Sequence, residues 1–248
     1  MTEAAPPPAP SIASLQDVVD DTYLFGLDRQ RETMDLTQSD GPYGDKYSSG
    51  YRTDMTGGTI TFVGTDEITV RAHFVGSAAP GPQSWLWGWE NVNSFPEPVV
   101  ARVAAVREFG QRFGITELTT AEVPLTTEPA TVARRFAAAA SLIAGPLPFV
   151  TFALENGTVL TFLVESPALE PIPASAIRAG SVLPEAASEG SISNWPRALR
   201  AYAQWRGFTL AEEGGAITLR APNGHVEAKL DDQGRLSALS MSAGPTPA

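Results

Sequence analysis

Cysteine is absent from the 248-residue chain, and its absence removes several classes of chemistry. Disulfides, thiolate nucleophiles, cysteine-bound zinc and cysteine-bound iron–sulfur clusters all require the sulfur of this residue. Histidine is nearly absent too, because the chain has only His73 and His225. His73 lies beside Arg71 in a strand pattern and is expected to face solvent, and His225 follows a turn signal. Neither has the serine and carboxylate context of a hydrolase, and we predict no metal site.

Positive charge is scarce, with 17 Lys and Arg residues against 28 Asp and Glu residues and a formal net charge of −11. Nucleic-acid affinity comes mainly from Lys and Arg side chains that neutralise phosphates, so this balance argues against a nucleic-acid partner. It argues equally against anionic membrane surfaces. An acidic protein is better suited to a basic partner, and simple solubility is the alternative meaning of the charge.

Long apolar runs are also missing. The longest uncharged apolar stretch is FAAAASLIAGPLPFVTFAL at 136–154, but Gly145, Pro146 and Pro148 interrupt it. The pattern favours a helix that ends near Gly145 and a buried strand after it, and no membrane span. The first ten residues, MTEAAPPPAP, lack the basic and apolar regions of a secretory signal and are interpreted as a flexible leader. We expect a cytoplasmic protein.

The common catalytic and cofactor motifs do not occur. The chain has no phosphate-binding G-x-x-x-x-G-K-[ST], no G-x-G-x-x-G after a strand, no H-E-x-x-H and no G-x-S-x-G. We therefore predict no cofactor and expect a protein that is not an enzyme. Carboxylates that are distant in sequence but converge in space remain the open alternative.

Apolar periodicity predicts an α+β fold in two parts, the first being an antiparallel sheet with helices packed on one face. This domain covers residues 11–166, and its clearest element is a hairpin at 147–165 with Asn156-Gly157 at the turn. Residues 167–193 are rich in Pro, Ala and Ser and are predicted to form a linker with room for a short helix. Residues 194–248 are predicted to form a small unit of one helix and a four-strand meander.

A long loop is predicted at 37–58, and it carries Tyr43, Tyr47 and Tyr51 among Gly, Ser and Asp residues. Such compositions are typical of binding loops, because Tyr supplies a large amphipathic contact area at a modest entropic cost. These three tyrosines are our candidates for binding a partner. The alternative is that the loop folds back and buries them against its own domain.

The stretch SWLWGWENVN at 84–93 places Trp85, Trp87 and Trp89 on one face of a predicted strand, because side chains alternate along strands. Such a stripe forms either a packed core or one wall of an apolar ligand pocket. For the second possibility the candidate residues are these three tryptophans, with Asn91 as a polar anchor at the rim.

The same stretch carries a resemblance. Trp-Leu-Trp-Gly-Trp-Glu-Asn, preceded by Val75-Gly76-Ser77, resembles the W-L-W-x-W-x-N core of a family of uncharacterised bacterial proteins, a domain of unknown function. Segments around Phe109-Gly110, Leu118-Thr119 and 149–163 are similar as well, so that the resemblance covers about residues 20–165. It implies a domain boundary and a shared fold, and no reaction.

From these observations we expect a non-enzymatic, acidic interaction module that binds a more basic protein, of the inhibitor, immunity or accessory type. The alternative is a small-molecule-binding protein whose apolar pocket is walled by the tryptophan stripe.

Overall fold

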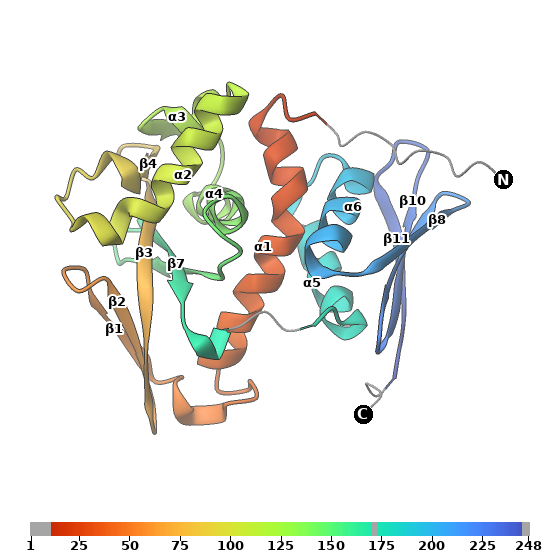
Figure 1. Ribbon diagram of the computed structural model, residues 1–248, viewed down its shortest axis with the longest axis horizontal. Coiled ribbons are helices and arrows are strands. Elements are labelled where there is room, and N and C mark those ends of the chain that lie inside the picture. The colour runs from red at the N-terminus through yellow and green to blue at the C-terminus, as the bar shows by residue number, and fades with distance from the viewer. Residues whose placement is uncertain (1–10, 170–172, 245–248) are drawn as a thin grey trace.

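The computed structural model describes residues 11–169 and 173–244, and the predicted leader at residues 1–10 lies outside them. A long helix, α1 (Leu15–Thr37), runs through the middle of the molecule between its two halves (Figure 1). Ser14 caps this helix by accepting a hydrogen bond from the backbone N–H of Asp17. Because α1 has neighbours on both sides, buried residues occupy most of its length between Val18 and Leu36.

The first half is built on a curled antiparallel sheet of seven strands, here called sheet A. Its central strand is β3 (Glu67–Ala79), which pairs with β2, β4 and β7. The strand β1 lies at one end of the order β1-β2-β3-β4-β5, and β6 pairs with β7. The other members of sheet A are β1 (Gly50–Asp54), β2 (Thr59–Val63), β4 (Ser84–Trp87), β5 (Glu122–Pro124), β6 (Phe149–Ala153) and β7 (Val159–Glu165).

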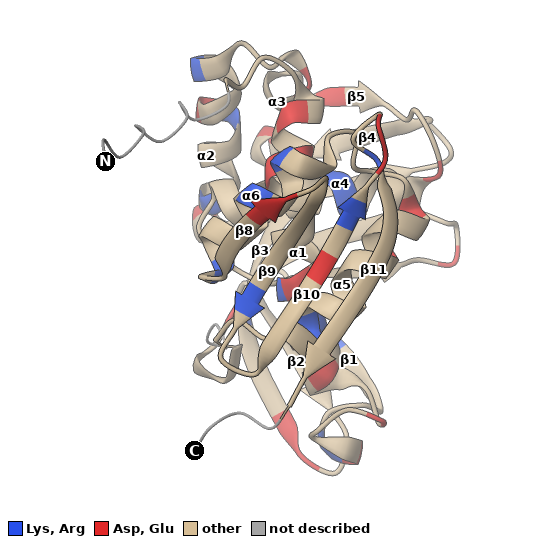
Figure 2. Cartoon of the chain, turned by 90° about the vertical axis from the view of Figure 1, so that its right-hand side faces the viewer, with Lys and Arg blue, Asp and Glu red and all other residues tan. Residues whose placement is uncertain are grey.

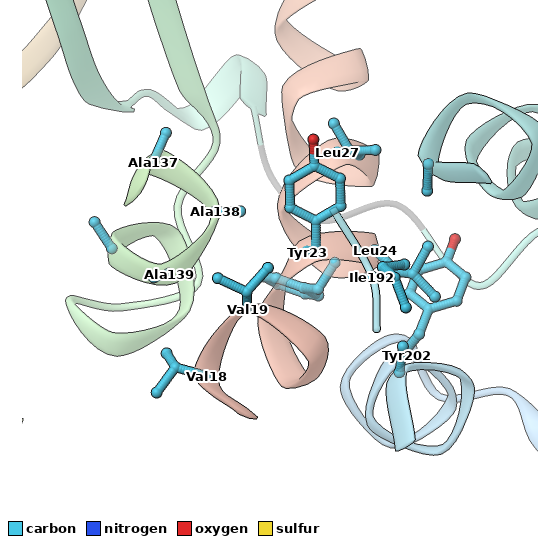
Figure 3. Packing of buried hydrophobic residues seen from close by; sticks show 14 of the residues in the cluster. Val18, Val19, Tyr23, Leu24, Leu27, Ala137, Ala138, Ala139, Ile192 and Tyr202 are labelled. Atoms are coloured by element: carbon cyan, nitrogen blue, oxygen red, sulfur yellow. The ribbon is translucent and has the colours of Figure 1, made fainter. Parts of the chain in front are cut away.

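Three further helices belong to the first half, namely α2 (Glu97–Phe113), the short α3 (Thr116–Thr119) and α4 (Pro129–Ile143). Of these, α4 contacts both sheet A and α1, α2 contacts β3 and α4, and α3 packs against α2. Of the small buried residues of α4 labelled in Figure 3, Ala138 is the one that faces α1. Gly26 of α1 permits this approach, since a Cβ atom there would lie 2.6 Å from the Cβ of Ala138. This contact fixes α1 onto the first half.

The second half consists of α5 (Ala176–Glu189), α6 (Trp195–Arg206) and a four-stranded antiparallel sheet, here called sheet B. Both helices contact α1 on one side and sheet B on the other. The strands of sheet B lie in the order β11-β10-β9-β8 and are β8 (Thr209–Glu213), β9 (Ala216–Ala221), β10 (Gly224–Leu230) and β11 (Leu236–Ala243).

The stretch predicted to be a linker contains α5, which is a 14-residue helix. Ser175 caps it, and the apolar side chains of Ala179, Val182 and Leu183 fall on one buried face. These apolar residues recur at helical spacing. The segment forms a helix because one apolar stripe is enough to hold it against α1 and sheet B.

The predicted α+β class with antiparallel sheets is confirmed. The segment between α2 and α4 forms the short helix α3 and the short strand β5. No helix within residues 11–169 and 173–244 combines the length and the apolar character needed to cross a bilayer.

Candidate functional site

The predicted tyrosine loop leaves α1 at its C-terminal end and leads into β1. A short 3₁₀ turn, η1 (Gly44–Lys46), holds the loop against the β2–β3 turn. The backbone N–H groups of Thr65 and Asp66 donate to the carbonyls of Asp45 and Lys46, at 3.0 Å each. The loop is therefore fixed at its centre by backbone hydrogen bonds.

The three tyrosines of this loop have different environments. Tyr43 and Tyr51 are 42% and 45% exposed, whereas Tyr47 is half-buried and packs against a core cluster of sheet A. The ring of Tyr51 stacks on Phe152 of β6 with a centroid separation of 3.9 Å, and the rings of Tyr43 and Tyr47 lie 6.0 Å apart. We call these four side chains the tyrosine patch. One tyrosine of the loop is thus packed against its own domain and two are exposed.

The strand beside the patch is an edge of sheet A. All five residues of β1 are exposed, and β1 pairs with β2 on one side. Among the described residues no strand pairs with its other side, so its outer backbone groups face outward. The surrounding segment 37–67 carries five carboxylates against two basic side chains, Lys46 and Arg52. Arg52 already forms a bidentate pair with Glu67.

The tryptophan stripe is mostly core. Trp85 and Trp87 are 0% and 1% exposed, and their rings pack edge to face at 5.3 Å. Phe136 of α4 contacts both rings, with centroid separations of 5.1 and 4.9 Å. The Nε1 of Trp87 donates to the carbonyl of Glu117 at 2.8 Å. The interpretation of the stripe as a packed core is confirmed for these two residues, because large rings from β4 and α4 fill the space beside them.

The remaining candidates of the stripe, Trp89 and Asn91, lie beyond the end of β4 in and after the 3₁₀ turn η2 (Gly88–Glu90). Trp89 is half-buried beneath the guanidinium of Arg107, which lies 4.6 Å from the ring centroid. The side chain of Asn91 accepts a hydrogen bond from the N–H of Phe95 at 2.8 Å and donates to its carbonyl at 2.9 Å. Both the oxygen and the nitrogen of the Asn91 side-chain amide are therefore used to close the loop that precedes α2.

A buried polar network joins α1 to α5 and α6, and the sequence did not lead us to expect it. At its centre the carboxylate of Asp28 accepts from the hydroxyl of Tyr202 and pairs with Arg206 of α6, both at 2.7 Å, and lies 3.7 Å from the guanidinium of Arg178 of α5. Arg29 pairs with Glu32 and donates to the carbonyl of Leu169 at 2.9 Å. One signal of this network is visible in the sequence, because charged residues recur at helical spacing on the same side of α1 as apolar ones.

Burial shifts the pKa values of this network. It raises the pKa of Glu32 to about 7, against the charges of Arg29 and Arg206, which lower it. Burial lowers the pKa of Arg29 and, together with the carboxylate of Asp28, raises that of Tyr202 well above its ordinary value. The network is thus a structural contact between the halves in which one carboxyl group titrates near neutral pH.

A second polar contact between the halves lies nearer the start of α1. The carboxylate of Asp20 accepts three hydrogen bonds from the segment before α6, two from Ser193 at 2.8 Å and one from the N–H of Asn194 at 3.1 Å. Arg197 forms a bidentate pair with Asp21 and reaches Asp17 at 2.7 Å. These bonds fix the start of α6 against α1.

The expectation that His73 faces solvent was wrong, since this side chain is 4% exposed. Its ring nitrogens lie 3.3 Å from the carbonyl of Pro98 and 3.3 Å from the carboxylate of Glu165. The start of α2 covers this part of β3, so both of its faces are buried. Burial would raise the pKa of Glu165, but the hydrogen bond from His73 and the charge of Arg102 outweigh it and lower that pKa.

Comparison with known proteins gives one result, a match between residues 16–167 and a family of unknown function, DUF6882. The chain belongs to this family. The resemblance inferred from the tryptophan core is thereby confirmed, and no curated protein and no solved structure matches the chain.

The DUF6882 match spans α1 to β7 and includes the tyrosine patch and the tryptophan stripe. It ends before α5, so α5, α6 and sheet B lie outside it. Three of the arginines that pair with acidic side chains of α1, namely Arg178, Arg197 and Arg206, therefore come from outside the matched segment.

Proposed function

We propose that the protein is a cytoplasmic, non-enzymatic interaction module of the inhibitor, immunity or accessory type, which binds a more basic protein through the tyrosine patch. The observation that carries this proposal is the position of Tyr51, which is 45% exposed and stacked on Phe152 beside the exposed edge strand β1. An extended segment of a partner adds readily to such an edge, with backbone hydrogen bonds supplying affinity and adjacent side chains supplying specificity.

The exposed rings favour binding on energetic grounds. A Tyr side chain buries about 150–250 Å² when it is fully covered, and nearly half of Tyr51 is still accessible. Covering the rest removes roughly 90 Å² from water, which is worth about 2 kcal/mol at ~25 cal/mol per Å². A patch with two such rings thus has the composition of an interface hot spot.

Local charge favours a basic partner. The segment 37–67 has three more carboxylates than basic side chains, and Asp40, Asp45 and Asp54 in it are exposed. A negative potential around the patch steers a positively charged protein toward it and raises the association rate, an effect that salt screens. We therefore expect the association to weaken as the ionic strength rises.

The alternative, a ligand pocket walled by the tryptophans, has less support. Trp85 and Trp87 are fully covered by the protein itself, and the amide of Asn91 is bonded to Phe95. A ligand at this place would have to displace core side chains, which costs several kcal/mol.

The test is affinity capture with the wild-type chain and two variants. The double variant Tyr43→Ser with Tyr51→Thr removes both exposed rings, while Tyr47 is left in place because it packs on the core. Val92→Ser is the matched control, since Val92 is an exposed apolar side chain, 61% accessible, on another loop.

We expect one stoichiometric protein to be retained by the wild type and by the control at low salt, released at high salt, and lost from the double variant. Equal unfolding temperatures of the three proteins would show that the fold is intact. Retention of the same partner by the double variant would contradict the proposal.

A further inference from the structure

A cavity of about 290 Å³ lies between the start of α1, the α3–β5 segment and α4, at a distance from the tyrosine patch. Its volume is close to the lower end of the range for small-molecule sites, roughly 300–1,000 Å³. We call it the α1–α4 cavity. Its lining includes four apolar residues, Leu15, Val123, Val132 and Phe136, and two charged ones, Glu117 and Arg135.

The apolar wall of the α1–α4 cavity is rigid. Phe136 is 4% exposed and is packed on its other side against Trp85 and Trp87. Val132 and Val123 are 4% and 9% exposed, and Val123 is fixed by its strand pairing with Trp85. A preformed apolar surface of this kind binds the hydrocarbon part of a ligand without first having to become ordered.

Arg135 gives the cavity its polar group. Its neighbour Arg134 is paired with Glu189, but within the described part of the chain Arg135 forms no ion pair and bonds through Nη2 to the side-chain oxygen of Gln16 at 2.9 Å. The guanidinium offers five N–H donors in a planar fork, and an anionic oxygen in the cavity accepts a strong charge-assisted hydrogen bond from such a group.

The second charged group sets the charge of the ligand. Glu117 is half-buried in the lining, and its carboxylate opposes a second negative charge in the same small space. Its backbone carbonyl already accepts from Trp87, so that the position of the residue is fixed. One negative charge on an apolar body therefore suits the cavity better than two.

We propose that the α1–α4 cavity binds a small apolar monocarboxylate. The carboxylate of the ligand is held by the guanidinium of Arg135, and its hydrocarbon part lies on Phe136 and Val132. This site goes beyond the proposed protein-binding function and does not depend on it.

The test is isothermal titration calorimetry of the full-length protein with 4-phenylbutyrate as the probe and its primary amide as the uncharged match. We expect the wild type to bind the carboxylate at least about tenfold more tightly than the amide, because charge-assisted hydrogen bonds are roughly twice as strong as neutral ones. Equal binding of the two probes, or no heat from either at millimolar concentration, would overturn the proposal.

Three variants locate the site. Arg135→Met, which keeps the aliphatic stem, should lose the preference for the carboxylate, whereas Arg220→Met, an exposed arginine on sheet B, should keep it. Glu117→Gln removes the opposing charge and should strengthen carboxylate binding a few-fold. If Arg135→Met does not fold, Glu117→Gln and the comparison of the acid with the amide still test whether the cavity binds a carboxylate. Undiminished carboxylate binding by folded Arg135→Met, or unchanged binding by Glu117→Gln, would contradict the assignment.

Discussion

Glu32 should make the stability of the fold depend on pH near neutrality, and a Glu32→Gln variant tests this directly. The side chain is 6% exposed and lies between Arg29 and Arg206 at the contact between α1 and α6. Burial raises its pKa from the ordinary 4.5 to about 7, and the two arginines only partly oppose that shift. Glutamine has nearly the same shape and does not titrate, so the variant keeps the packing and removes the proton.

The sign of the pH dependence of stability follows from the direction in which the pKa of Glu32 is shifted. Between pH 4.5 and about 7 the folded protein holds a proton on Glu32 that the unfolded chain has released. The free energy of unfolding must therefore fall as the pH rises through this window. At ~1.4 kcal/mol per pH unit, the interval from 4.5 to about 7 gives an upper limit of about 3 kcal/mol. Carboxylates with lowered pKa values, such as Glu165 and Asp231, act in the opposite direction but below this window.

The assay is urea unfolding of the wild type and Glu32→Gln at pH values on either side of this window. The wild type should be less stable at the higher pH by about 1–3 kcal/mol, and the variant should lose most of this difference. Glu108→Gln, at an exposed position on α2, is the matched control and should retain the slope of the wild type. An undiminished slope in Glu32→Gln would refute the reasoning, because the titrating group would then lie elsewhere.

Three further changes test the packing, each by urea unfolding with the wild type as reference. Gly26→Ala should destabilise the protein by about 1–3 kcal/mol because its Cβ would meet Ala138, although the same change in an open helix stabilises by about 1 kcal/mol; a gain in stability would contradict the close approach. Arg206→Met should cost about 3 kcal/mol because it removes the closer of the two arginines that pair with the buried carboxylate of Asp28 and leaves only Arg178, at 3.7 Å. Trp87→Ala should cost about 3–5 kcal/mol because it opens a cavity in the core, and a loss below 1 kcal/mol would show that the site collapses or is already loose.

The parts of the fold that local sequence controls were predicted well. The hairpin of β6 and β7 has Asn156-Gly157 in its turn, and Gly157 adopts a φ of 78° that suits glycine there. The alternation of side chains along β4 likewise places Trp85 and Trp87 together on the core side. Both features depend on neighbours within a few residues, which is the range at which a pattern carries information.

The parts that depend on distant contacts were not predicted. The composition of residues 167–193 is that of a linker, and α5 is held there by α1 and sheet B, elements that lie far from it in the sequence. The prediction that His73 is exposed was wrong because it, too, depends on a distant contact. The start of α2 covers the strand of His73. In the tyrosine loop, composition made Tyr43 and Tyr51 candidates for binding a partner. It gave no sign that Phe152, from the hairpin of β6 and β7, stacks on Tyr51.

The two halves meet through opposite charges, and this bears on where a basic partner would bind. Figure 2 shows the second half in front, with sheet B facing the viewer and both acidic and basic residues on its strands. Arg178, Arg197 and Arg206 of this half pair with carboxylates of α1 and partly neutralise their charge. Most of the net charge of −11 is therefore expressed on other surfaces, and one of them is the segment 37–67 around the tyrosine patch, with five carboxylates and two basic side chains. The internal neutralisation of α1 thus favours the tyrosine patch over α1 as the surface that attracts a basic protein.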